Sequence, residues 1–148
     1  MKLTSTFDIA APPSVVWDIT ADVEHWNEWT PTITSIEWVE GNSIAVGNRA
    51  RIKQPGQSAA IWTVDHVEPG RAFRWSTKNM GARFVGTHEV EPSASGTRAT
   101  LGIEASGVGA ILMYPILAVA LRGVLKKERA GLTALAEERA KTAQQGAD

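Results

Sequence analysis

The sequence predicts an α+β protein in which an antiparallel sheet of about seven strands is wrapped around one long C-terminal helix. Strand-like segments with period-two alternation and turn residues between them fill residues 32–106. The pattern from Val108 onward is helical. A chain of 148 residues suits one ordinary domain, so we expect a single domain over residues 1–148, with a frayed tail over about 142–148.

The first strand is expected over residues 2–9, and two short helices should follow it. Pro12 and Pro13 suit a helix entrance, because a missing N–H costs nothing there. Thr30 precedes Pro31 and is therefore pushed toward extended geometry, which ends the helical stretch. Apolar side chains recur at helical spacing between these points: Val15, Val16, Ile19 and Val23.

Six further strands are expected, each ending at a turn signal such as Pro55-Gly56 or Pro69-Gly70. Their predicted ranges are 33–40, 48–54, 59–68, 72–78, 83–91 and 98–105. Since no helix separates them, neighbouring strands should pair antiparallel. Alternation then places one apolar set on a concave face: Ile36, Trp38, Trp62, Val64, Phe73, Trp75, Phe84, Val90, Leu101 and Ile103.

The C-terminal helix opens with an apolar run, VGAILMYPILAVAL, that ends at Arg122. This run is shorter than the roughly twenty residues that cross a bilayer, so we expect a buried helix and no transmembrane segment. Pro115 should either kink the helix or separate a lead-in from it. The side chains expected against the sheet are Leu121, Val124, Leu125, Leu132 and Leu135.

Composition narrows the possible functions. Fifteen basic and sixteen acidic residues leave a formal charge of −1, so no electrostatic excess favours nucleic acid as a partner. The absence of cysteine excludes disulfides, thiolate metal sites and cysteine nucleophiles. The N-terminal stretch MKLTSTFDIAAPPS lacks the apolar core of a secretory signal, so we expect a cytoplasmic protein.

Three stretches carry a family resemblance: IAAPPSVVWDITADVEHWNEWTPTI, VDHVEPGRAFRW and THEVEPSASGTRAT. Together they resemble the START-like (SRPBCC) superfamily, in its polyketide cyclase/dehydrase branch. The most specific motif is a proline pair before Val-Trp, followed by Trp26, Trp29 and Pro31 as W-x-x-W-x-P. The resemblance implies the helix-grip fold, with a cavity between the sheet and the C-terminal helix. Members that look like this include lipid carriers, hormone-binding proteins, aromatase/cyclases and chaperone activators.

Ligand-binding residues are predicted on the concave face and on segments that the resemblance places near the cavity. The aromatic residues of the strands fall on the same face of the sheet. An aromatic-lined pocket requires this arrangement, and an ordinary packed core requires it equally. The resemblance places Met113 and Tyr114 over the cavity mouth, where the phenol either donates to a ligand oxygen or packs beside Pro115. The predicted set is Trp29, Trp38, Trp62, Phe73, Trp75, Phe84, His88, Met113 and Tyr114.

His88 shares the parity of Phe84, so it should point inward among apolar neighbours. It is either a core histidine bonded to the backbone or the polar anchor or general base of the cavity. Only His88 and Tyr114 are candidate catalytic groups, and no nucleophile or phosphate loop accompanies them. Three dispersed histidines without a close carboxylate pair do not predict a metal site, and no cofactor is expected.

These observations favour a non-catalytic carrier or sensor that binds a hydrophobic small molecule or lipid, because binding requires only a cavity. An alternative is a polyketide cyclase or aromatase-like enzyme that uses the same cavity. A second alternative is a protein-interaction module of the chaperone-activator type. The ligand class stays open among sterol, acyl chain, polyketide and isoprenoid, and the oligomeric state between monomer and homodimer.

Overall fold

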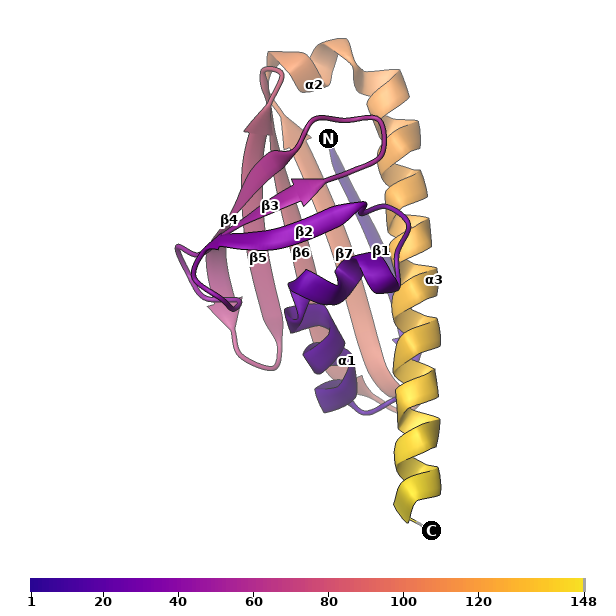
Figure 1. The fold of residues 1–148 in the computed structure, drawn as a ribbon. Coiled ribbons are helices and arrows are strands. Elements are labelled where there is room, and N and C mark those ends of the chain that lie inside the picture. Colours follow the sequence, from indigo (N-terminus) through magenta and orange to yellow (C-terminus); the bar gives the residue numbers. More distant parts are fainter. Residues whose placement is uncertain (148) are drawn as a thin grey trace.

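The computed structural model describes residues 1–147, and in this range seven strands form one antiparallel sheet (Figure 1). The strand order across the sheet is β1-β7-β6-β5-β4-β3-β2, so every neighbour except β1 and β7 is also a neighbour in sequence. The predicted α+β helix-grip architecture is confirmed. The strands are β1 (Lys2–Ile9), β2 (Ser35–Glu40), β3 (Arg49–Lys53), β4 (Ala60–Glu68), β5 (Ala72–Asn79), β6 (Ala82–Ser93) and β7 (Gly96–Ser106).

The first strand of the chain, β1, pairs along its whole length with the last strand, β7, and Phe7 lies opposite Ala99. Gly96 in the β6–β7 turn makes this possible. Its φ is +131°, and a Cβ there would lie 2.7 Å from the Ala11 carbonyl oxygen and 2.9 Å from that of Ile9. Only glycine allows the chain leaving β1 to pass this close to the turn.

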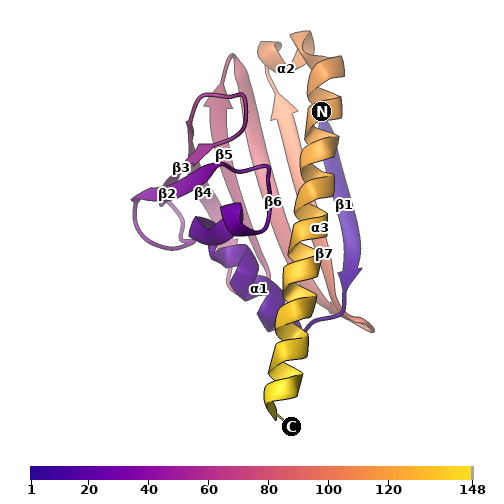
Figure 2. The same cartoon turned by 45° about the vertical axis from the view of Figure 1, so that its right-hand side comes forward.

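Two short helices follow β1, as predicted: α1 (Pro13–Ala21) and η1 (Val23–Glu28). The second is a 3₁₀ helix, and Trp29 ends it by donating its backbone N–H to the Trp26 carbonyl at 3.1 Å. Both helices lie on the same side of the sheet as the C-terminal helix (Figure 2). They bury Val16, Ile19, Val23 and Trp26.

The C-terminal region divides into α2 (Val108–Leu112) and α3 (Tyr114–Ala147). Pro115 follows the break at Met113, so the proline separates a lead-in from the main helix, the second of the two predicted outcomes. The helix continues past residue 142, where the sequence predicted fraying, through Ala147, while Asp148 lies outside the described residues. Within residues 1–147, no helix is both long and apolar enough to cross a membrane.

The packing of α3 decides where space remains beneath it. The helix contacts β1, β7 and α1, which lie toward one edge of the sheet (Figure 2). Leu125 and Leu132 are buried in the core cluster formed there, whereas Leu121, Val124 and Leu135 are half-buried. A second cluster lies under η1 on β2 to β5 and includes Trp26, Phe73 and Trp75. A cavity lies between these clusters and the N-terminal half of α3.

Candidate functional site

The cavity has a volume of about 150 Å³ and lies between the sheet and α3. Most of its wall is apolar. Its aromatic side chains are Trp26, Trp62, Trp75 and Phe84, and its aliphatic ones are Ile33, Ile52, Ala60, Leu101, Ile103, Leu117, Ala120, Leu121, Val124 and Leu125. Its polar side chains are Gln54, Gln57, Thr77, Asn79, His88 and Glu128.

Gly86 allows the Trp75 indole to form part of the wall. The two residues are paired directly across β5 and β6. A Cβ at position 86 would lie 2.9 Å from Trp75 Nε1, so the indole occupies the space that a side chain would fill. Trp75 then packs against Trp62, with ring centroids 5.6 Å apart, and edge-on against Trp26 at 5.2 Å.

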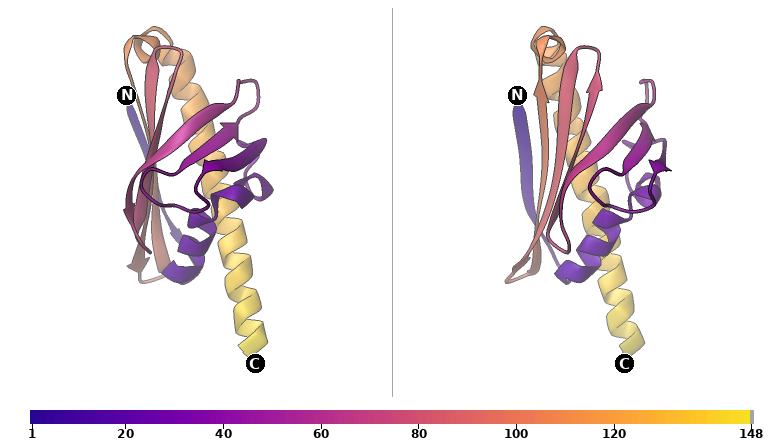
Figure 3. Two further views of the ribbon diagram at one scale, coloured as in Figure 1. Left: turned by 60° about the vertical axis from the view of Figure 1, so that its left-hand side comes forward. Right: turned by 90° about the vertical axis from the view of Figure 1, so that its left-hand side faces the viewer.

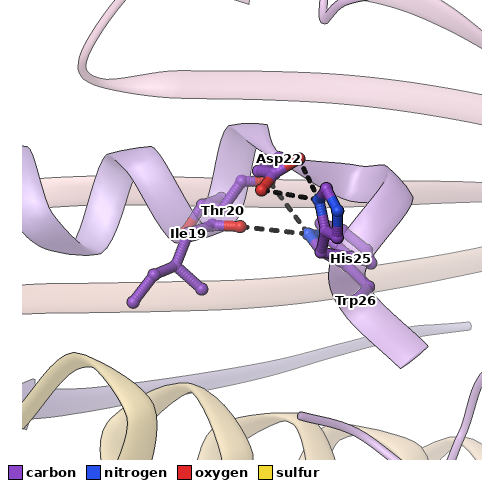
Figure 4. Close-up of polar contacts among 5 residues, drawn as sticks. All are labelled: Ile19, Thr20, Asp22, His25 and Trp26. Atoms are coloured by element: carbon purple, nitrogen blue, oxygen red, sulfur yellow. Dashed lines mark hydrogen bonds and ion pairs between the residues drawn. The ribbon is translucent and has the colours of Figure 1, made fainter. Parts of the chain in front are cut away.

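Trp26 is 2% exposed, and hydrogen bonds from its indole N–H hold the ring in place. Its Nε1 donates to the Thr20 carbonyl at 3.1 Å and to the Ile19 carbonyl at 3.3 Å (Figure 4). Because both acceptors belong to the last turn of α1, the indole is held in place without using any polar group of the cavity. The neighbouring His25 is exposed and bonds Asp22 at 2.8 Å, which raises the pKa of this imidazole.

His88 is only 6% exposed and belongs to the cavity wall. Its ring stacks on Phe73, with centroids 4.7 Å apart, and lies 4.8 Å from the ring of Trp26. Its Nδ1 is buried without a hydrogen-bond partner. Desolvation lowers the pKa of His88 to about 3, so the imidazole is neutral at physiological pH. The structure therefore does not give Nδ1 the backbone partner that the core-histidine interpretation requires.

Glu128 is the ionisable wall residue that sequence reasoning missed, and Gln54, Gln57, Thr77 and Asn79 are uncharged polar ones that it also missed. It is half-buried on α3 and accepts a hydrogen bond of 3.5 Å from Thr32 Oγ1, which also contacts Thr30 Oγ1 at 3.0 Å. Desolvation raises the pKa of Glu128 to about 7, while the bond from Thr32 acts in the opposite direction. At neutral pH a large fraction of this carboxyl is protonated, and it can then both donate and accept.

A helical-spacing signal for Glu128 was present in the sequence. The residue follows Val124 by four and Leu125 by three, so it continues the inward face of α3. Its charged neighbours Lys127 and Arg129 are typical of a solvated stretch of helix, which hides this signal. Among the residues described, no three His, Asp or Glu side chains are grouped so as to hold a metal ion.

The structure brings together part of the predicted ligand-binding set. Trp62, Trp75, Phe84 and His88 all contribute to the cavity wall. Phe73 is fully buried behind His88, and Trp38 and Trp29 pack against the second core cluster.

Two predicted residues lie elsewhere. Met113 and Tyr114 are 47% and 53% exposed, because the break before α3 points them into solvent rather than over the cavity. Neither residue lines the cavity.

Fold and site together define a helix-grip protein with an apolar internal cavity. The chain belongs to the family described as polyketide cyclase/dehydrase and lipid transport, whose model matches residues 1–137. This confirms the resemblance to the START-like superfamily.

Individual relatives are distant. An uncharacterized protein of Mycobacterium tuberculosis is 27% identical over 135 residues, covering 84% of this chain and 80% of the relative. A hypothetical protein of Helicobacter pylori has a TM-score of 0.79 at 16% identity, covering 92% of this chain and 88% of that one. The di-domain ARO/CYC StfQ from the steffimycin biosynthetic pathway has a TM-score of 0.74 at 14% identity, covering 95% of this chain and 51% of its own. At these identities the solved structures establish a shared fold.

Proposed function

We propose that the protein is a non-catalytic carrier or sensor that binds an apolar small molecule or lipid between the sheet and α3. The observation that carries the proposal is the cavity wall of aromatic and aliphatic side chains. A ligand that buried on the order of 300 Å² of apolar surface would gain roughly 7 kcal/mol before the costs of binding. That gain allows micromolar affinity at best.

The ligand should carry one uncharged hydrogen-bonding group, such as a hydroxyl or a carbonyl. His88 and Glu128 are the wall residues that support this proposal, since one has an unpartnered buried nitrogen and the other a carboxyl that is about half protonated at neutral pH. A ligand oxygen beside either group would satisfy a polar atom that the protein leaves unpaired or weakly paired. A permanent ligand anion would instead face a desolvated acid, and within the described residues no lysine or arginine lines the cavity wall to balance its charge.

A second candidate function is catalysis of the cyclase type, and Glu128 is the observation that favours it. An acid whose pKa lies at about 7 inside an apolar cavity suits general acid–base chemistry at neutral pH. The two groups predicted from sequence suit it less well. His88, with a pKa of about 3, is a weak base, and Tyr114 is exposed outside the cavity.

Native mass spectrometry of protein purified from its own host, followed by solvent extraction, tests the proposal. We expect a co-purifying apolar molecule with a single hydroxyl or carbonyl. If the protein carries no such mass and also fails to bind N-phenyl-1-naphthylamine, an apolar fluorescent probe, the binding proposal is wrong. Chemical analysis of the extracted molecule after incubation with fresh protein separates the two functions, since a carrier returns it unchanged and an enzyme converts it.

A further inference from the structure

One end of the molecule exposes large apolar side chains that the cavity does not use. Six residues between positions 108 and 119 are each 53% to 76% exposed: Val108, Ile111, Leu112, Tyr114, Ile116 and Val119. We call them the apolar cap. They lie on α2 and the first turns of α3, at the end of the sheet where β7 leads into α2 (Figure 3). Met80, in the adjacent β5–β6 turn, is 87% exposed.

The helical segments of the cap expose their large apolar side chains, whereas an ordinary surface helix buries them. The side chains that α2 and this part of α3 bury are small, namely Ala110 and Ala118, while the isoleucines, leucine and valines face solvent. Close packing of α2 against the β5–β6 turn fixes this orientation. The Gly109 backbone N–H donates to the Gly81 carbonyl at 3.1 Å, and so close an approach leaves space only for small side chains between the two segments. A concentrated apolar surface of this kind marks an interaction site.

Charge around the cap identifies the partner. No Asp or Glu occurs between Glu104 and Glu128, whereas Arg122, Lys126 and Lys127 lie in that interval. The β5–β6 hairpin adds Lys78 and Arg83, which are paired across its strands beside Met80. Two acidic residues lie beside Arg83: Asp65 at 4.0 Å, and the exposed Glu104 on β7, which is also the cross-strand partner of Lys2. The apolar cap is therefore bordered by a basic fringe.

We propose that the apolar cap docks onto the surface of an anionic lipid bilayer, with its apolar side chains among the upper acyl chains and the basic fringe at the headgroups. Apolar side chains and basic groups on one surface are what interfacial binding requires. Tyr114 suits the boundary, since a phenol has an apolar ring and a polar tip. A symmetric contact between two copies would instead bring their basic fringes together, which like-charge repulsion opposes.

The cap also adjoins the cavity. Leu117 and Leu121 belong to the cavity wall, and on α3 they alternate with the exposed Ile116 and Val119. Docking would thus bring the end of the cavity that Leu117 lines close to the bilayer surface. The proposal goes beyond ligand binding, because it names the surface from which an apolar ligand would be collected or to which it would be returned.

Co-sedimentation of the full chain with lipid vesicles tests the docking surface. We expect stronger binding to phosphatidylcholine vesicles that contain phosphatidylglycerol than to pure phosphatidylcholine, and weaker binding at high salt. The double variant Ile111→Ser/Ile116→Ser should lower the partition coefficient about tenfold or more. Arg122→Gln/Lys126→Gln should lower binding to the anionic vesicles alone. Val46→Ser is the matched control, since Val46 is 66% exposed in the β2–β3 connection, outside the cap.

Circular dichroism and light scattering accompany each variant. Equal vesicle binding by the folded cap variant and the wild type would overturn the proposal. So would a wild-type dimer that becomes a monomer in the cap variant without any vesicle binding, because the cap would then be a contact between copies. Vesicle binding is measured without ligand, so either outcome leaves the cavity proposal to its own test.

Discussion

The imidazole of His88 lies flat against the ring of Phe73, with centroids 4.7 Å apart and ring planes inclined by 10°. The two residues are direct partners across β5 and β6, and Phe73 is fully buried. The stack leaves Nδ1 of His88 buried without a partner beside an apolar cavity. This nitrogen is the atom that the proposed function pairs with a ligand oxygen, and its removal gives the first prediction.

His88→Phe should keep the stack on Phe73 and delete only the ring nitrogens. Because Nδ1 has no protein partner, we expect the free energy of unfolding to stay the same or to rise by about 1 kcal/mol. Affinity for decanol should fall by about tenfold, while affinity for decane should not change. Displacement of N-phenyl-1-naphthylamine by the two compounds measures this difference. A destabilised variant with unchanged decanol affinity would mean that His88 serves the core alone.

Ionisation of His88 and of Glu128 should make the free energy of unfolding depend on pH in opposite directions. The pKa of His88 falls from 6.5 to about 3 on folding, so below pH 6.5 the unfolded chain takes up a proton that the folded chain does not. Stability contributed by this group is complete above pH 6.5 and declines by about 1.4 kcal/mol per pH unit on acidification, down to about pH 3. The pKa of Glu128 rises from 4.5 to about 7, so its contribution is complete below pH 4.5 and is lost as the pH rises to about 7.

Between pH 4.5 and 6.5 the two effects oppose each other. Glu128→Gln removes only the second, so this variant should lose stability on acidification more steeply than the wild type over that range. Urea unfolding at a series of pH values measures both curves. Parallel curves for wild type and variant would show that Glu128 ionises normally in the folded protein.

Val124→Phe should fill part of the cavity, because Val124 is half-buried on the α3 side of its wall. The added ring volume is expected to weaken binding of N-phenyl-1-naphthylamine by at least about tenfold, with a stability change of at most about 3 kcal/mol. Val46→Phe is the control, since Val46 is 66% exposed in the β2–β3 connection, outside both the cavity and the apolar cap. If both substitutions leave probe affinity unchanged, the probe binds outside this cavity.

Gly86→Ala should disturb the cavity wall by moving the Trp75 indole. A Cβ there would lie 2.9 Å from Trp75 Nε1, and we expect a loss of about 1 to 3 kcal/mol with a shift in tryptophan fluorescence. Gly102→Ala on the neighbouring strand is the control, because its Cβ would meet Thr87 and Thr4 at ordinary distances of 3.6 and 3.7 Å. Thermal melts of both variants decide the matter, and equal stabilities would contradict the close approach.

Local patterns predicted the fold and part of the cavity wall. Alternation along each strand is a property of a few neighbouring residues, so it predicted that Trp62, Trp75, Phe84 and His88 share one face of the sheet. Alternation says nothing about which rings on that face reach the cavity. Phe73 has the same parity as Trp75, yet it lies behind His88 and is fully buried.

The sequence by itself determined the order of elements, the antiparallel sheet, the inward parity of its aromatic residues and an irregularity of the C-terminal helix near Pro115, because each follows from periodicity or from the chemistry of one residue. Only the tertiary structure decided that α3 packs toward β1 and β7, and therefore that a cavity remains beside Trp26 and Glu128. It also decided that small alanines face inward near α2, which leaves the apolar cap outside. Such outcomes depend on how close distant segments approach one another, and that distance is set by side chains far apart in the chain.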